Sequence, residues 1–206
     1  DSKWDMFPVP GLFEMNGYGD RIYVNVGYVW RNQFNNNPPF VEERNNYVGS
    51  YRQNFTIPAD WKGEKVYIHI GSATSNLKVW VNGKYVGYSE DSKMAAEFDI
   101  TDYVEFGKQN LIAMQIMRWC DGSYLEDQDF WRFTGIAREA YLYARPQSRI
   151  KDYRVYTNLD SEYKNAKFSV EVDVINPEAK VLLTKLIDEN GKAIINDKIE
   201  LTGSDT

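Results

Sequence analysis

Apolar and polar side chains alternate with a period of two along several short stretches of this chain. Such alternation predicts strands that turn one face to a core. The clearest stretches are 22–26, 51–55, 66–70, 77–81, 110–117 and 138–143. Asn82-Gly83 precedes a further stretch at 85–88, and the tolerance of this dipeptide for positive φ favours a type I′ hairpin. The pattern favours no long helix and one helical turn, at 99–104, so we predict an all-β chain.

The segments between these strands suggest the architecture. Residues 1–20 are rich in proline and glycine, which favours an irregular lead-in. Long excursions at 31–48 and 119–135 interrupt the strands and are typical of functional loops at one end of a sandwich. We therefore predict that residues 1–145 form a jelly-roll β-sandwich.

Arg145-Pro146 marks a predicted domain boundary, and the aromatic content falls beyond it. The tail predicts strands at 150–157, 167–175, 180–188 and 193–196, with a hairpin turn at 189–192. These are about half of the strands that an immunoglobulin-like sandwich needs, so residues 146–206 are interpreted as a truncated start of such a domain. The chain lacks an initiator methionine and ends without a closing feature, which predicts a piece of a longer protein. Its compartment, cytoplasm or periplasm, stays open.

Composition narrows the possible partners. The net charge of −6 argues against a nucleic-acid partner, because phosphate binding needs clustered Lys and Arg. No apolar run approaches the roughly 18–20 residues that would cross a bilayer, so we expect no membrane partner. A single cysteine, Cys120, and a single histidine, His69, are too few for a disulfide framework or a zinc or copper site. We expect Cys120 to be a buried or half-buried free thiol rather than a nucleophile, and His69 to lie on the outer face of its strand.

Residues 118–136 concentrate acidic and aromatic side chains. The acids are Asp121, Glu126, Asp127 and Asp129, and the rings are Trp119, Tyr124, Trp131 and Phe133. Like charges this close raise one another's pKa, and rings beside carboxylates are a common way to hold a sugar. The residues alone leave two alternatives open: a solvated acidic loop whose rings plug the sandwich, or a glycosidase pair with carboxyl groups about 5–5.5 or 6.5–9.5 Å apart.

The same segment carries a resemblance to a known family. The run Asp121-Gly-Ser-Tyr-Leu-Glu-Asp-Gln-Asp-Phe-Trp-Arg132, followed by Thr-Gly-Ile, resembles a signature of the N-terminal sandwich in the β-galactosidase branch of glycoside hydrolase family 2. Further segments share in this resemblance, which covers residues 8–146: 9–10, 15–18, 22–26, 37–41, 79–88, 91–92 and 97–99.

The resemblance implies the front part of a retaining β-galactosidase, with a galactose-binding-domain-like sandwich at residues 1–145. By that likeness Asp129 contacts galactose hydroxyls and helps to ligate sodium, while Asn25 and Val26 line the same pocket. The catalytic residues, two glutamates with a magnesium ion nearby, lie on a later TIM barrel, so this fragment contains none of them and is expected to be inactive alone. Implied partners are the β-galactoside, that barrel and further copies in a homo-oligomer. Two other functions remain open: a stand-alone carbohydrate-binding module, and a β-glucuronidase or β-mannosidase of the same family.

Overall fold

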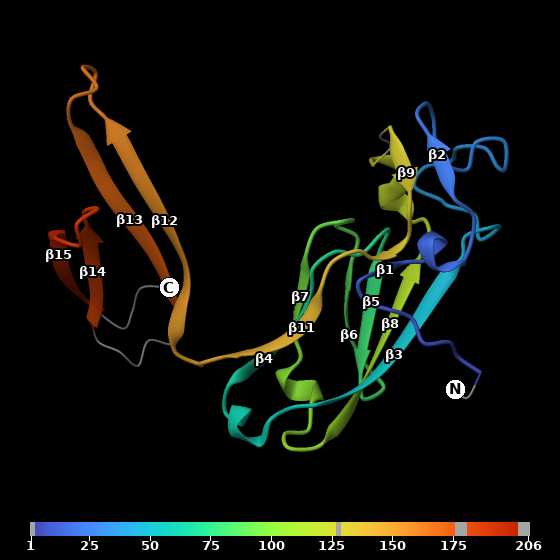
Figure 1. Ribbon diagram of the computed structural model, residues 1–206, viewed down its shortest axis with the longest axis horizontal. Coiled ribbons are helices and arrows are strands. Elements are labelled where there is room, and N and C mark those ends of the chain that lie inside the picture. Colours follow the sequence, from blue (N-terminus) through green and yellow to red (C-terminus); the bar gives the residue numbers. More distant parts are fainter. Residues whose placement is uncertain (1–2, 127–128, 176–180, 202–206) are drawn as a thin grey trace. The chain divides into compact units, whose positions relative to one another are not determined.

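The computed structural model describes residues 3–126, 129–175 and 181–201. The chain divides into two compact units, Asp1–Ala144 and Arg145–Thr206. Each unit is built from antiparallel strands (Figure 1). The helical elements among the described residues are four 3-10 turns: η1 (Glu14–Asn16), η2 (Ala59–Trp61), η3 (Thr101–Tyr103) and η4 (Asp121–Tyr124). The all-β fold that the sequence predicts is confirmed.

Two sheets form the body of the first unit. One sheet has the strand order β3-β8-β5-β6, with bounds Val48–Thr56, Gln109–Met117, Leu77–Val81 and Lys84–Ser89. The other has the order β11-β4-β7, with bounds Ala140–Arg145, Lys65–Ile70 and Ala96–Asp99. Two short ribbons accompany them: β1 (Gly11–Leu12) with β10 (Gly135–Ile136), and β2 (Ile22–Val24) with β9 (Phe130–Arg132).

The core lies between the two main sheets and follows from the alternation in the sequence. In β4 the buried side chains are Val66, Ile68 and Ile70, and in β8 every second residue from Asn110 to Ile116 is buried. These side chains join one cluster with the inward residues of β5. His69 lies on the opposite face of β4, as predicted, where it is hydrogen-bonded to Glu97 at 2.9 Å.

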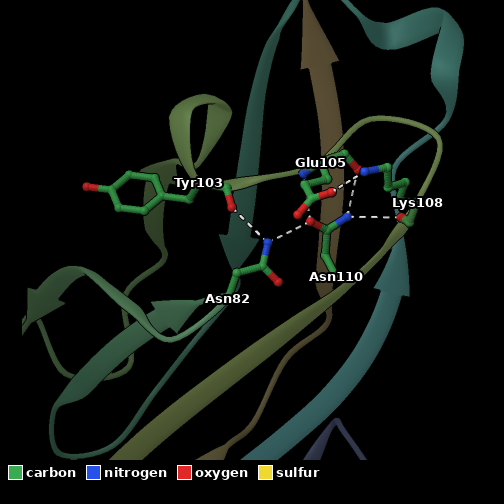
Figure 2. A network of polar contacts seen from close by, with 5 residues as sticks. All are labelled: Asn82, Tyr103, Glu105, Lys108 and Asn110. Atoms are coloured by element: carbon green, nitrogen blue, oxygen red, sulfur yellow. Dashed lines mark hydrogen bonds and ion pairs between the residues drawn. The ribbon is translucent and has the colours of Figure 1, made fainter.

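A buried asparagine network closes one end of the sandwich. Asn82 and Gly83 both have positive φ, and Val81 pairs with Lys84, so the predicted two-residue hairpin is confirmed. The Asn110 side chain accepts hydrogen bonds from the Glu105 N–H (2.7 Å) and from Asn82 Nδ2 (2.8 Å). Its Nδ2 donates to the carbonyls of Glu105 and Lys108, both at 3.0 Å. Figure 2 shows how this amide joins the β5–β6 hairpin to the loop before β8.

The predicted helical turn at 99–104 is confirmed as η3, and the Asp99 side chain bonds to its first residue, Thr101. One carboxylate oxygen accepts hydrogen bonds from the Thr101 hydroxyl (2.5 Å) and N–H (3.0 Å), and the other pairs with Lys65 at 3.1 Å. Burial raises the pKa of Asp99, but the bonds from Thr101 and the ion pair with Lys65 outweigh it, and the pKa lies below its ordinary value.

A glycine in β3 allows an aromatic ring to approach the backbone. A Cβ added at Gly49 would lie 2.0 Å from Cζ of Phe13, whose ring packs over this strand. Phe13 is itself buried and contacts the rings of Phe7 and Tyr51 at centroid distances of 6.0 Å. Because residue 49 has no side chain, Phe13 and the lead-in segment that carries it can pack directly against β3.

The second unit contains two hairpins in its described part. β12 (Arg149–Leu159) pairs with β13 (Ala166–Ile175), and β14 (Val181–Ile187) pairs with β15 (Ala193–Glu200). The predicted turn at 189–192 connects the second pair and contains Gly191 at φ 80°. Across the described residues of the whole chain, no helix has the length and apolar character that a membrane span requires.

Candidate functional site

Two predicted site residues, Asn25 and Asp129, lie next to the β2–β9 ribbon in the chain. The ribbon pairs Tyr23 with Trp131 and Val24 with Phe130, so Asn25 follows the last paired residue of β2 and Asp129 precedes the first paired residue of β9. Directly opposed residues share one face of a ribbon, so Tyr23 and Trp131 lie on the same side. Tyr23, Asn25, Asp129 and Trp131 are exposed, whereas Val24 and Phe130 on the other side of the ribbon are half-buried. We call these four residues the ribbon face.

A tyrosine holds the carboxylate of the ribbon face. The hydroxyl of Tyr23 donates a hydrogen bond to Oδ1 of Asp129. This bond raises the pKa of Tyr23, and desolvation and the negative charge of Asp129 contribute in the same direction. Oδ2 of Asp129 has no hydrogen-bond partner among the residues that the structure describes. That oxygen is therefore available to a ligand.

The ribbon face also offers an apolar platform. The Trp131 ring lies 5.5 Å from that of Tyr23 and stacks on Phe133 at 5.7 Å with an interplanar angle of 13°. Half of the Trp131 side chain is exposed, at 51%. An exposed ring beside an exposed carboxylate presents the two surfaces that a sugar needs, a flat apolar face and a hydrogen-bond acceptor.

The predicted strand at 22–26 is too long by two residues. β2 ends at Val24, and Asn25 and Val26 lie in the bend that follows. Gly27 has φ 78°, so the chain turns away immediately after them. Val26 is 65% exposed and Asn25 is exposed, which makes both side chains accessible from solvent.

Two cations support the ribbon from its half-buried side. The Phe130 ring is contacted by the guanidinium of Arg132 at 4.2 Å and by Nζ of Lys93 at 4.5 Å. Burial lowers the pKa of Lys93 and the nearby Arg132 lowers it further, against the opposing effect of Glu126. Cation–π contacts of this kind fix the orientation of Phe130 and hence that of β9.

An aromatic plug holds the two long loops together. Trp30 is fully buried and stacks on Tyr28 and Phe34 at 5.2 Å, while Trp119 and Tyr124 meet its edge or face at 5.8 and 4.8 Å. The Tyr124 hydroxyl donates to the Phe40 carbonyl at 2.7 Å. Some rings of the 118–136 segment therefore do plug the sandwich, whereas Trp131 faces outward.

The acids of the 118–136 segment have different partners. Asp121 lies with Glu90 and Cys120 in the one group of three potential metal ligands found among the described residues, within 4.8 Å of one another. Burial raises the pKa of Glu90 and Asp121 raises it further, partly offset by a bond from Tyr88. Cys120 is buried and burial raises its pKa, so the predicted buried free thiol is confirmed. Asp127 lies outside the described residues. Sequence reasoning did not foresee the contact with Glu90.

The cation expected at Asp129 fits the donor available there. Sodium is a hard cation that prefers oxygen ligands, and the free Oδ2 of Asp129 supplies one. A complete coordination shell needs several oxygens, so further ligands would come from other groups.

Comparison with curated proteins identifies close relatives. The chain is 45% identical to a β-galactosidase from Priestia megaterium over 84% of its residues, and 38% identical to one from Clostridium acetobutylicum over 97%. A β-galactosidase from Vibrio cholerae is 42% identical over 83%. The chain spans only 17%, 22% and 16% of the lengths of these three relatives.

Solved structures share the fold. A glycosyl hydrolase family 2 member from Bacteroides cellulosilyticus matches 75% of the chain with a TM-score of 0.61 and 27% identity, and the match covers 21% of that protein. A β-glucuronidase from Bacteroides uniformis matches 76% with a TM-score of 0.66 and 23% identity, covering 20% of that protein, which supports the fold alone. The family model described as "Glycosyl hydrolases family 2, sugar binding domain" matches residues 2–146. The chain therefore belongs to glycosyl hydrolase family 2.

Proposed function

We propose that this chain is the front part of a retaining β-galactosidase and that its ribbon face forms one wall of the galactose pocket. The observation that carries the proposal is the pairing of the exposed Asp129 carboxylate, oriented by Tyr23, with the exposed Trp131 ring. The relatives named β-galactosidase support the choice of sugar over a glucuronide or mannoside. Bond cleavage belongs to two glutamates on the barrel, outside this chain.

Each residue of the ribbon face has a defined task in this proposal. Asp129 accepts hydrogen bonds from galactose hydroxyls and supplies one oxygen to a sodium ion, which when bound adds a positive charge that attracts further hydroxyl oxygens. Asn25 and Val26, in the bend beside it, contact the sugar ring. Trp131 covers an apolar face of the sugar and excludes water from it.

The test is a kinetic comparison in the full-length protein. Asp129→Asn keeps the volume of the side chain but removes its charge, and hydrogen bonds to charged groups contribute about 1.5–3 kcal/mol each. We expect KM for a chromogenic β-galactoside to rise by roughly ten- to a hundredfold, kcat to fall, and the dependence on sodium to weaken. Asp60→Asn is the matched control, because Asp60 is an exposed acid in η2.

Three outcomes would contradict the proposal. Unchanged KM and kcat in Asp129→Asn would remove the ribbon face from the active site. Cleavage of a β-glucuronide or β-mannoside in preference to a β-galactoside would keep the family and change the substrate. An inactive full-length protein that still binds galactose at the ribbon face would instead indicate a carbohydrate-binding module.

A further inference from the structure

Two hairpin turns of the chain carry the same three residues, Asn-Gly-Lys. Residues 82–84 connect β5 to β6 in the first unit, and residues 190–192 lie between β14 and β15 in the second. An asparagine followed by glycine loses its side-chain amide most readily, because glycine has no side chain to shield its backbone nitrogen. The same local sequence makes both turns reactive, so a difference between them must come from the structure.

The loss of the amide needs no reagent other than water. The glycine nitrogen attacks Cγ of the asparagine, the amide nitrogen leaves as ammonia together with the proton of the glycine N–H, and a cyclic imide forms. Water then opens the imide at either carbonyl and gives aspartate or isoaspartate. Hydrogen bonds that hold the asparagine amide or the glycine N–H slow this deamidation, because they must break before Cγ and the nitrogen can meet.

Three hydrogen bonds hold the amide of Asn82. Its Nδ2 donates to the Tyr103 carbonyl and to Oδ1 of Asn110, both at 2.8 Å, and Figure 2 shows this group between its two acceptors. Its Oδ1 accepts from the Leu111 N–H at 2.9 Å. The turn also follows β5, an inner strand of the four-stranded sheet. All three bonds must therefore break before Cγ of Asn82 can reach the nitrogen of Gly83.

The amide of Asn190 makes no hydrogen bond to the residues that the structure describes. The backbone N–H of Asn190 donates to Oδ1 of Asp188 at 2.9 Å, and the Gly191 N–H donates to the Asp188 carbonyl at 3.0 Å. Only the second of these bonds involves a reacting atom. Within the described chain β14 and β15 pair only with each other, and a two-stranded hairpin of this kind opens readily at its exposed turn.

We propose that Asn190 is a site of spontaneous deamidation in the folded chain, whereas its hydrogen bonds protect Asn82. Both asparagines are exposed, so access to water does not distinguish them. The bonds on the reacting groups do, with three at Asn82 and one at Asn190. Two additional bonds of ordinary net strength correspond to a roughly tenfold difference in rate. This modification goes beyond the proposed function, because it needs no sugar, cation or barrel.

The test is incubation of the 206-residue chain in mildly alkaline buffer, followed by digestion and mass spectrometry of the peptides that contain residues 82 and 190. In the folded chain we expect aspartate and isoaspartate to accumulate roughly tenfold faster at residue 190 than at residue 82. In guanidinium chloride, which unfolds both turns, the two rates should be similar. Asn190→Gln is the control for the assignment, because the longer side chain cannot form the same cyclic imide and the fast product should disappear.

A second variant tests the protection of Asn82. Asn110→Ala removes one of the two acceptors of Nδ2, so deamidation at residue 82 should rise severalfold. The rate at residue 190 should stay unchanged, because that turn belongs to the other unit. The same incubation therefore contains its own matched reference.

Several results would overturn the proposal. Equal rates at residues 82 and 190 in the folded chain, or a faster reaction at residue 82, would show that the hydrogen bonds do not protect Asn82. A tenfold difference that persists in guanidinium chloride would trace the effect to local sequence and not to the structure. Asp129→Asn should leave both rates unchanged even where it abolishes turnover in the full-length protein, so this inference and the proposed function can fail separately.

Discussion

Truncation of Asn110 should destabilise the first unit more than any surface change of similar size. The side chain is 2% exposed and makes four hydrogen bonds, two as acceptor and two as donor. Asn110→Ala leaves two carbonyls, one backbone N–H and the Asn82 amide without this partner. At about 0.5–1.5 kcal/mol for each bond, and with some of these groups rehydrated in the exposed loop, we expect a loss of about 3 kcal/mol.

Urea unfolding followed by tryptophan fluorescence measures this loss. All six tryptophans lie in the first unit, so the signal reports that unit and not the second. The midpoint should fall while the m-value stays constant, and the melting temperature should drop by on the order of 10 °C. Gln109→Ala, at the exposed neighbouring position in β8, is the control and should change stability by less than about 0.5 kcal/mol.

An isosteric variant separates the hydrogen bonds from the volume of the side chain. Asn110→Asp fills the same space but places an acceptor against the carbonyls of Glu105 and Lys108, to which Nδ2 donates in the native chain. It should therefore be at least as destabilising as Asn110→Ala at pH 7. A loss below about 1 kcal/mol in both variants would refute the network as a source of stability.

Two further predictions concern the sandwich. Gly49→Ala places a Cβ 2.0 Å from Cζ of Phe13, so the ring must move and the free energy of unfolding should fall by about 3 kcal/mol in the same urea assay. Gly122→Ala is the control, because its Cβ would make an ordinary contact with Sγ of Cys120 at 3.5 Å. Equal effects of the two substitutions would contradict the steric argument. The pKa of Asp99 is lowered in the folded state, so its contribution to the free energy of unfolding is complete above the unfolded pKa, near 3.8, and is lost as pH falls through the lower folded pKa. Asp99→Asn should therefore flatten the dependence of stability on pH between about pH 4 and 2. An unchanged pH dependence in this variant would contradict the argument.

Local patterns were sufficient for the strands and turns. The alternation at 66–70 and 110–117 predicts which side chains are buried, because the period of the pleat matches the period of the sequence. Asn82-Gly83 predicts its own hairpin, since both residues tolerate the positive φ that the turn requires. The short extent of β2 was not predictable from alternation, because that strand ends at Val24, opposite Phe130, where its partner β9 begins.

The candidate sites depend on contacts between distant segments. Asp129 and Tyr23 are 106 residues apart, and no local pattern indicates their hydrogen bond. Glu14 belongs to a residue type that is seldom fully buried, yet the structure buries it where Thr134 donates to its carboxylate.

The sequence by itself determined the fold class, the hairpins and, through the resemblance of residues 8–146, the family. These properties are encoded by side-chain periodicity, turn chemistry and long motifs, which act over a few residues at a time. Only the tertiary structure decided which acids share an environment, and which rings pack between the loops and which face solvent. Those properties arise when sheet packing brings distant segments within hydrogen-bonding distance. No local sequence pattern marks such long-range contacts.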